Sequence, residues 1–113
     1  MTVVETPSFL RDAAAALSEQ ERANLVTYLA TNPEAGEIMA GTGGIRKLRW
    51  AVQGRGKRGG ARVIYYYHSA LIPLFLLNVF PKNEKANLSQ AERNDMRQLV
   101  PRIVAGYQKR LAK

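Results

Sequence analysis

Lysine and arginine side chains gather in the middle of this sequence, and their chemistry is its most distinctive feature. Residues 1–40 contain two basic and six acidic residues, whereas residues 41–113 contain fifteen basic and three acidic ones. Within residues 41–62 there are seven basic residues and no acid. Such a field attracts a polyanion, of which phosphate backbones are the commonest in cells. The alternative is a solvated loop that only aids solubility, but solubility does not require an acid-free cluster.

A set of lysine, arginine and tyrosine side chains could cleave RNA without a metal ion. The ribose 2′-hydroxyl would attack the adjacent phosphorus, so the nucleophile belongs to the substrate. The protein would remove that proton, neutralise charge on the phosphate and assist departure of the 5′ oxygen. Arginine suits the second task through its bidentate fork. Lysine or tyrosine can move the protons only if its pKa is lowered. Tyr66 or Trp50 could stack a base, yet the same residues fit passive RNA binding equally well.

Several other chemistries are excluded or disfavoured by the residues present. The chain has no cysteine, which excludes disulfides and thiolate metal sites. The acids after residue 40 are too few and too scattered for a two-metal nuclease site, and the single histidine, His68, is too little for a two-histidine ribonuclease mechanism. The glycine-rich run at residues 41–46 lacks the Lys-Ser/Thr pair of a Walker A loop. We therefore expect no metal and no cofactor.

Nothing in the sequence indicates a membrane or an export signal. No apolar run approaches the roughly 20 residues that a bilayer-spanning helix needs. The first twenty residues carry Glu5, Asp12 and Glu19 and lack an uninterrupted apolar core, unlike a signal peptide. The sequence predicts a cytoplasmic protein with no membrane contact, and its length of 113 residues predicts a single domain over 1–113.

The elements that would position these side chains begin with a short strand at Val3 and Val4. Thr6-Pro7 starts a helix, whose predicted apolar face is Leu10, Ala13, Ala14 and Leu17. Ser18 and Glu21 form a capping box for a second helix, which runs to about residue 31 with Leu25, Val26 and Leu29 buried.

Three strands and a helix are expected in the rest of the chain. The strands cover residues 45–50, 61–68 and 72–80, with a basic glycine-rich loop at 53–60 between the first two. Ser89 and Glu92 form another capping box, and Pro101 should kink or split the last helix. The result is an α+β fold with a small antiparallel β-sheet in β-α-α-β-β-β-α order. We expect its helices to pack on one face, which leaves the other face open for binding.

Strand alternation predicts which side chains line that open face. If Leu48 and Val63 point at the helices, then the opposite face carries Lys47, Arg49, Arg62 and Tyr66.

Three motifs in the basic half resemble the HigB branch of the RelE superfamily: Gly41-Thr42-Gly43-Gly44-Ile45-Arg46-Lys47, Gly56-Lys57-Arg58-Gly59-Gly60-Ala61-Arg62 and Lys82-Asn83-Glu84. The resemblance covers nearly the whole chain, including the order of its elements. It implies a RelE-like toxin of a type II toxin–antitoxin system, which enters the ribosomal A site and cleaves the messenger RNA there. It also implies a cognate antitoxin, commonly a helix-turn-helix (HigA-like) protein that links the toxin to operator DNA.

The resemblance also implies roles for individual residues. Arg62 matches the family arginine that opens the third strand and contacts the phosphate, and Lys82 matches a basic residue just after the last strand. Asn83 stands where arginine is frequent and Ser89 where some members have tyrosine, which leaves the general acid and base open. The candidate catalytic residues are Arg62, Lys82, Lys57 and Tyr66. The candidate RNA-binding residues are Lys47, Arg49, Arg55, Arg58, Asn83 and Lys85.

Three functions compete. The first is a ribosome-dependent endoribonuclease, and the second is a non-catalytic basic protein that binds RNA or the ribosome. The third is a DNA-binding regulator, which is disfavoured because the densest charge falls on strands and a glycine loop rather than on a recognition helix. Growth arrest on expression in a bacterium would favour the first over the second.

Overall fold

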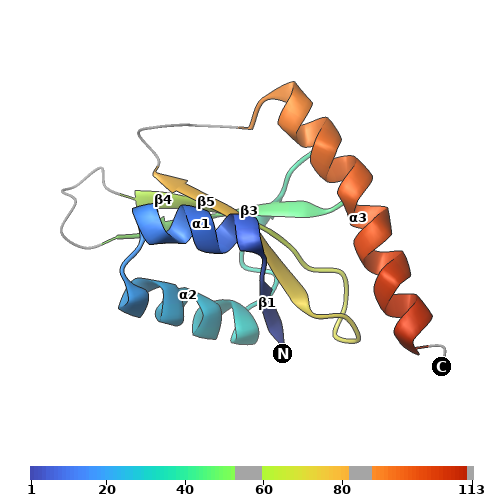
Figure 1. The fold of residues 1–113 in the computed structure, drawn as a ribbon, viewed down its shortest axis with the longest axis horizontal. Coiled ribbons are helices and arrows are strands. Elements are labelled where there is room, and N and C mark those ends of the chain that lie inside the picture. The colour runs from blue at the N-terminus through green and yellow to red at the C-terminus, as the bar shows by residue number, and fades with distance from the viewer. Residues whose placement is uncertain (53–59, 82–87, 112–113) are drawn as a thin grey trace.

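The centre of the computed structural model is a sheet with strand order β1-β5-β4-β3-β2 (Figure 1). The structure describes residues 1–52, 60–81 and 88–111, with the side chains of the last helix as far as Tyr107. In these residues the strands are β1 (Val3–Glu5), β2 (Glu37–Ile38), β3 (Ile45–Ala51), β4 (Gly60–Tyr66) and β5 (Leu74–Pro81). The helices are α1 (Pro7–Ala16), α2 (Glu19–Thr31) and α3 (Gln90–Leu111). The α+β class and the order of the predicted elements are confirmed.

The first two helices begin at the predicted caps. Thr6 accepts a hydrogen bond from the Phe9 N–H at 3.3 Å and donates to the Leu76 carbonyl at 2.7 Å, so it also ties the start of α1 to β5. Ser18 and Glu21 satisfy each other's N–H groups at 3.1 and 2.8 Å, which confirms the capping box of α2.

The inward face of α1 differs from the predicted one. Phe9, Ala13 and Ala16 are buried against the sheet, whereas Leu10 is 42% exposed and Ala14 is exposed. The observed spacing is also helical, and it places the large Phe9 ring in the core at the expense of Leu10, because an aromatic side chain buries more apolar surface. The buried face of α1 is therefore rotated about the helix axis relative to the predicted one. Ala13 and Leu17 belong to both faces.

Helices cover both faces of the sheet, which corrects the expected one-sided packing. Side chains of α1 and α2 pack with Val63, Tyr65 and Leu76 on one face. On the other face, α3 packs with Ile64, Tyr66 and other apolar side chains. The physical reason is that α3 carries an apolar stripe that has to be buried, and this face offers apolar partners for it. The residues that α3 contributes are Met96, Val100, Ile103, Val104 and Tyr107.

Figure 1 shows that α3 lies toward one end of the sheet, away from the end of β3 and the start of β4. At that second end the face remains uncovered by α3. Of the two outcomes expected at Pro101, a kink or a split, the split does not occur, because α3 continues through Pro101 as a single helix. Ser89 and Glu92 exchange hydrogen bonds at its start, at 3.2 and 2.9 Å, as predicted. None of the helices in the described residues combines the length and apolar character that crossing a membrane requires.

The strands β3, β4 and β5 form the antiparallel meander that the sequence predicted. The sheet as a whole is mixed, since β1 runs parallel to β5. It also includes β2, which the sequence analysis missed because it has only two residues, Glu37 and Ile38. The connection from β2 to β3 is a tight turn in which the buried Thr42 hydroxyl donates to the Met39 carbonyl at 2.6 Å and accepts from the Ile45 N–H at 3.1 Å.

Candidate functional site

The strand register confirms the predicted face of the basic side chains. Arg49 on β3 lies directly opposite Arg62 on β4, and Leu48 lies opposite Val63. Because Val63 belongs to the core beneath α1 and α2, Arg49 and Arg62 point to the other face. Lys47, two residues from Arg49, shares that face. Arg49 and Arg62 lie toward the end of the sheet that α3 leaves uncovered, and Lys47 lies opposite Ile64, which belongs to the core beneath α3.

These cations line a cleft of about 460 Å³ at the side of the sheet where β2 begins and β3 extends beyond it. We call it the basic cleft; its polar side chains are Glu37, Lys47, Arg49 and Arg62, and Ala35 and Leu48 complete the lining. Glu37 is the direct cross-strand partner of Lys47, so its side chain lies on the same face. Glu37 has no signal in the sequence, because β2 is too short to leave a strand pattern.

Arg62 is the most constrained cation of the basic cleft. Its side chain is half-buried, and its Nε is fully buried without a hydrogen-bond partner among the described residues. A buried donor on a charged group lowers stability unless something accepts its hydrogen bond. Arg62 also lines the cleft, and the planar fork of its guanidinium matches the geometry of a phosphate.

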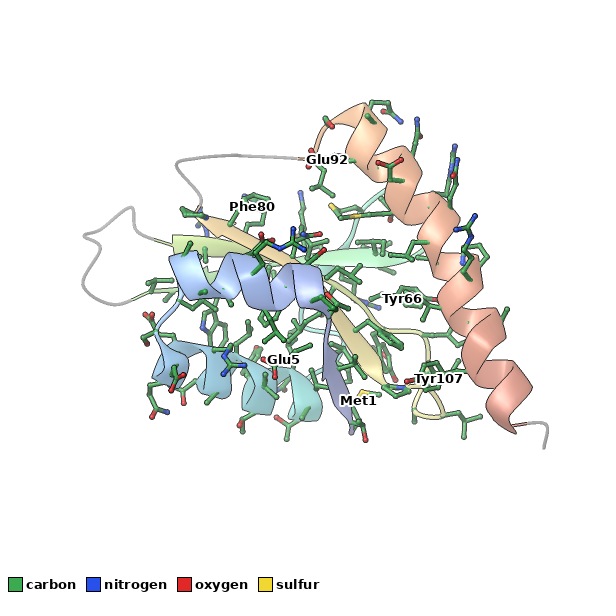
Figure 2. All side chains as sticks on the ribbon, viewed as in Figure 1. Met1, Glu5, Tyr66, Phe80, Glu92 and Tyr107 are labelled. Carbon is green, nitrogen blue, oxygen red and sulfur yellow. The ribbon has the colours of Figure 1, made fainter. Side chains whose placement is uncertain are left out.

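Tyr66 shares the face of Arg62, as predicted, but it does not line the basic cleft. Only 4% of it is exposed, because it lies beneath α3 (Figure 2) in the core on that face. Burial raises the pKa of the Tyr66 hydroxyl, the opposite of what proton transfer at neutral pH requires. Its hydroxyl contacts Nδ1 of His68 at 3.1 Å. Its expected position on an open surface is therefore wrong, since α3 covers it.

Trp50 is on the opposite face from the basic cleft. It packs partly against the core beneath α1 and α2, with its ring centroid 5.3 Å from that of Tyr28. It is therefore not placed to stack the base of a nucleotide whose phosphate contacts Arg62.

The segment that leads into β2 is pinned from both sides. The Tyr65 hydroxyl donates to the Pro33 carbonyl and accepts from the Gly36 N–H, each at 2.8 Å. Arg46 donates to the Gly36 carbonyl at 2.8 Å. A Cβ on Gly36 would lie 2.7 Å from the Lys47 carbonyl oxygen and 2.8 Å from the Tyr65 ring, so this position has no room for a side chain. The residue before Glu37 is thereby fixed.

Burial raises the pKa of the Tyr65 hydroxyl, against the opposing effects of the Gly36 N–H and the charge of Arg46. A tyrosine hydroxyl is already neutral at physiological pH, burial favours this neutral form further, and a neutral hydroxyl can donate and accept at once. The hydrogen bond that Tyr65 donates to the Pro33 carbonyl depends on this proton.

We expect Tyr65→Phe to lower the free energy of unfolding by about 1–3 kcal/mol, because it leaves the Gly36 N–H and the Pro33 carbonyl without their partner. Chemical denaturation would measure the loss. Tyr28→Phe, at a half-exposed ring, is the matched control and should change stability by under about 0.5 kcal/mol.

Folding raises the pKa of Tyr65, so the unfolded chain ionises first. The advantage of the wild type over Tyr65→Phe should therefore shrink as the pH rises above about 10. Equal stabilities at pH 7 would contradict this role.

Part of the expected site lies outside the described residues, and the structure does not place it. These candidates are Arg55, Lys57, Arg58, Lys82, Asn83 and Lys85.

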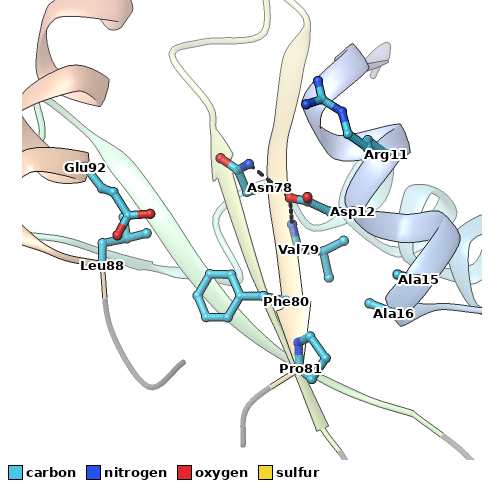
Figure 3. A pocket seen from close by; sticks show the side chains of 10 residues that line it. All are labelled: Arg11, Asp12, Ala15, Ala16, Asn78, Val79, Phe80, Pro81, Leu88 and Glu92. Atoms are coloured by element: carbon cyan, nitrogen blue, oxygen red, sulfur yellow. Dashed lines mark hydrogen bonds between the residues drawn. The ribbon is translucent and has the colours of Figure 1, made fainter. Parts of the chain in front are cut away.

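A larger groove, of about 630 Å³, runs along β5 between α1 and the start of α3 (Figure 3). Asp12 reaches from α1 to accept hydrogen bonds from the Asn78 side chain at 3.0 Å and the Val79 N–H at 3.3 Å. Glu92 lines the groove from the side of α3. The carboxylates of Asp12 and Glu92 make this groove a poorer place for a polyanion than the basic cleft.

The described residues gather no group of three or more His, Cys, Asp or Glu side chains that could hold a metal ion. The basic cleft is instead lined by Lys47, Arg49 and Arg62, with Glu37 as the acid among its lining residues. A cleft of this composition can bind a phosphate and neutralise added negative charge on it.

Fold and cleft together define a small α+β protein with a cationic site on one face of its sheet. Residues 2–113 match the family described as the RelE toxin of the RelE / RelB toxin–antitoxin system. The chain belongs to this family of RelE toxins. Its fold is also similar to a structure of an arginine-to-alanine mutant of the E. coli toxin RelE in the free state. The TM-score is 0.53 and the sequence identity 17%, over 75% of this chain and 86% of that one.

Proposed function

We propose that this chain is a HigB-like toxin that cleaves messenger RNA in the ribosomal A site, through attack of the ribose 2′-hydroxyl and without a metal ion. The observation that carries the proposal is the cleft in which Lys47, Arg49 and Arg62 meet on one face of the sheet. An electrostatic site of this kind suits a reaction whose nucleophile is supplied by the substrate.

In this proposal the cations divide the work. Arg62 neutralises the charge that builds on the phosphate, and Lys47 and Arg49 hold the RNA backbone beside it. Lys57 and Lys82 remain candidate catalytic residues, and Arg55, Arg58, Asn83 and Lys85 remain candidate RNA contacts. Tyr66 has no part in proton transfer while α3 covers it.

The proposal extends to the surroundings of the protein. In this proposal the protein forms a single domain over residues 1–113, acts in the cytoplasm and is held inactive by a cognate antitoxin. The family supports an antitoxin partner; we propose that it is a HigA-like helix-turn-helix protein and that operator DNA is contacted through it.

Dependence on the ribosome is the direct test of this function. In the described part of the cleft, Glu37 is the one acid among three cations. With so few groups for proton transfer, we expect the protein alone to be a poor catalyst on free RNA. We expect the purified protein to cleave messenger RNA on programmed ribosomes and to leave the same RNA intact when ribosomes are omitted. Cleavage should persist with a chelator, provided that the magnesium of the ribosome is maintained. A protein that binds programmed ribosomes and cuts nothing would instead be the passive RNA- or ribosome-binding protein.

A further inference from the structure

The proposed function gives a role to each cation that lines the basic cleft, but none to Glu37, which also lines it. It is exposed, and it lies on the same face as Lys47, Arg49 and Arg62. No ion pair within the described residues joins it to a cation. A carboxylate beside a phosphate-binding cluster weakens the attraction for RNA. Its presence at this place therefore calls for a chemical role that outweighs that effect.

We propose that Glu37 is the general base that takes the proton from the ribose 2′-hydroxyl in the basic cleft. This inference rests on the proposed function and adds to it the proton acceptor that the motifs left open. A carboxylate is already deprotonated at neutral pH, whereas a lysine ammonium has to lose a proton before it can accept one. Among the described side chains that line the cleft, Glu37 is the one that can accept the proton directly.

The sheet places Glu37 at a suitable distance from Arg62. Glu37 on β2 is in register with Lys47 on β3 and Ile64 on β4, and Arg62 lies two residues away along β4, so the Cα atoms of Glu37 and Arg62 are roughly 12 Å apart at the usual strand and residue spacings. The proposal requires that a phosphate held by the long Arg62 side chain has its neighbouring ribose on the side of β2. The carboxylate and the guanidinium can then act on adjacent groups of the same nucleotide, the 2′-hydroxyl and the phosphate.

The backbone around Glu37 is held firmly enough for such a role. The Gly36 N–H and carbonyl are both hydrogen-bonded, to Tyr65 and Arg46, and Glu37 itself pairs with Lys47 across β2 and β3. Since effective proton transfer requires a positioned acceptor, this fixed backbone favours catalysis over a merely solvated carboxylate.

The reaction balances without any further reactant. Glu37 takes the proton of the 2′-hydroxyl as the 2′ oxygen forms its bond to phosphorus, and the bond from phosphorus to the 5′ oxygen breaks. The departing 5′ oxygen takes a proton from solvent, and Glu37 later returns its own proton to solvent. The products are a 2′,3′-cyclic phosphate and a 5′-hydroxyl.

The test compares Glu37→Gln, which keeps the shape of the side chain, with Glu34→Gln. Glu34 is also exposed and lies three residues earlier, outside the cleft lining, so this control removes the same charge. Single-turnover cleavage on programmed ribosomes is measured across a range of pH. Glu37→Gln should be at least about 10²-fold slower and should lose the fall in rate at low pH that protonation of a base causes. Glu34→Gln should match the wild type in both.

Binding to ribosomes programmed with a message that carries 2′-deoxyribose at the cleavage site separates catalysis from charge. Glu37→Gln should bind at least as tightly as the wild type, because it removes a negative charge beside the RNA. Slower cutting with undiminished binding supports a general base. Cleavage at the parental rate with an unchanged pH profile overturns the inference and leaves the proposed function standing. A wild-type protein that cuts no message overturns both.

Discussion

Replacing the ribose 2′-hydroxyl with hydrogen at the cleaved nucleotide should abolish cutting at that nucleotide. In the proposed mechanism the nucleophile belongs to the substrate, so no side chain of the protein can replace it. The measurement uses programmed ribosomes with a message that carries one 2′-deoxyribose at the known cleavage position. A message with the same change at a neighbouring nucleotide is the control, and it should be cut at the normal rate.

The chemistry of the ends provides an independent check. Attack by the 2′-hydroxyl leaves a 2′,3′-cyclic phosphate, or its opened form, on the upstream fragment. Rapid cutting of the 2′-deoxy message, or a 3′-hydroxyl on that fragment, would show that water or a protein group is the nucleophile. Either result would refute the proposed mechanism and would remove the need for a base at Glu37.

Strand alternation was sufficient to predict which basic side chains share a face. Leu48 and Val63 have to be buried, and in a strand the neighbouring positions then point the other way. Lys47, Arg49 and Arg62 accordingly lie on the face opposite the first two helices. This part of the site depends only on local backbone geometry and on the burial of apolar residues.

The position of α3 depended on tertiary packing and was predicted wrongly. The residues of β4 from Val63 to Tyr66 are all apolar or aromatic and all buried. A continuous run of this kind is typical of a strand that is covered on both faces, and it was the available signal that α3 returns over the sheet. The consequence for the site is that Tyr66 belongs to a core and not to a binding surface.

Glu37 and its support could not be predicted from spacing along the chain. A two-residue strand shows no alternation, and the contacts of Gly36 come from Tyr65 and Arg46, which are distant in sequence. The glycine is explained only by the backbone and the ring that approach it. Long-range contacts of this kind have no local signature, so a structure was needed to bring the carboxylate into the cleft.

Arg62→Ala should slow cleavage on programmed ribosomes by about 10²-fold or more, the usual effect of removing one preorganised donor from a developing charge. The stability of the variant should change by less than about 1 kcal/mol. Two features of the folded state favour this. Arg62 lies directly opposite Arg49, and like charges in this position repel each other. Its buried Nε also lacks a hydrogen-bond partner among the described residues, so truncation removes an unsatisfied donor.

A large loss of rate without a loss of stability separates a functional arginine from a structural one. Arg62→Lys should recover only part of the rate, because a point charge cannot reproduce the bidentate fork. Arg102→Ala removes the same charge from the exposed surface of α3 and should leave cleavage unchanged. Each variant is measured by single-turnover cleavage and by a thermal melt. If Arg62→Ala folds normally and cuts at nearly the parental rate, Arg62 is not part of the site. If it fails to fold, the arginine is structural, and the anion-binding role proposed for it is wrong.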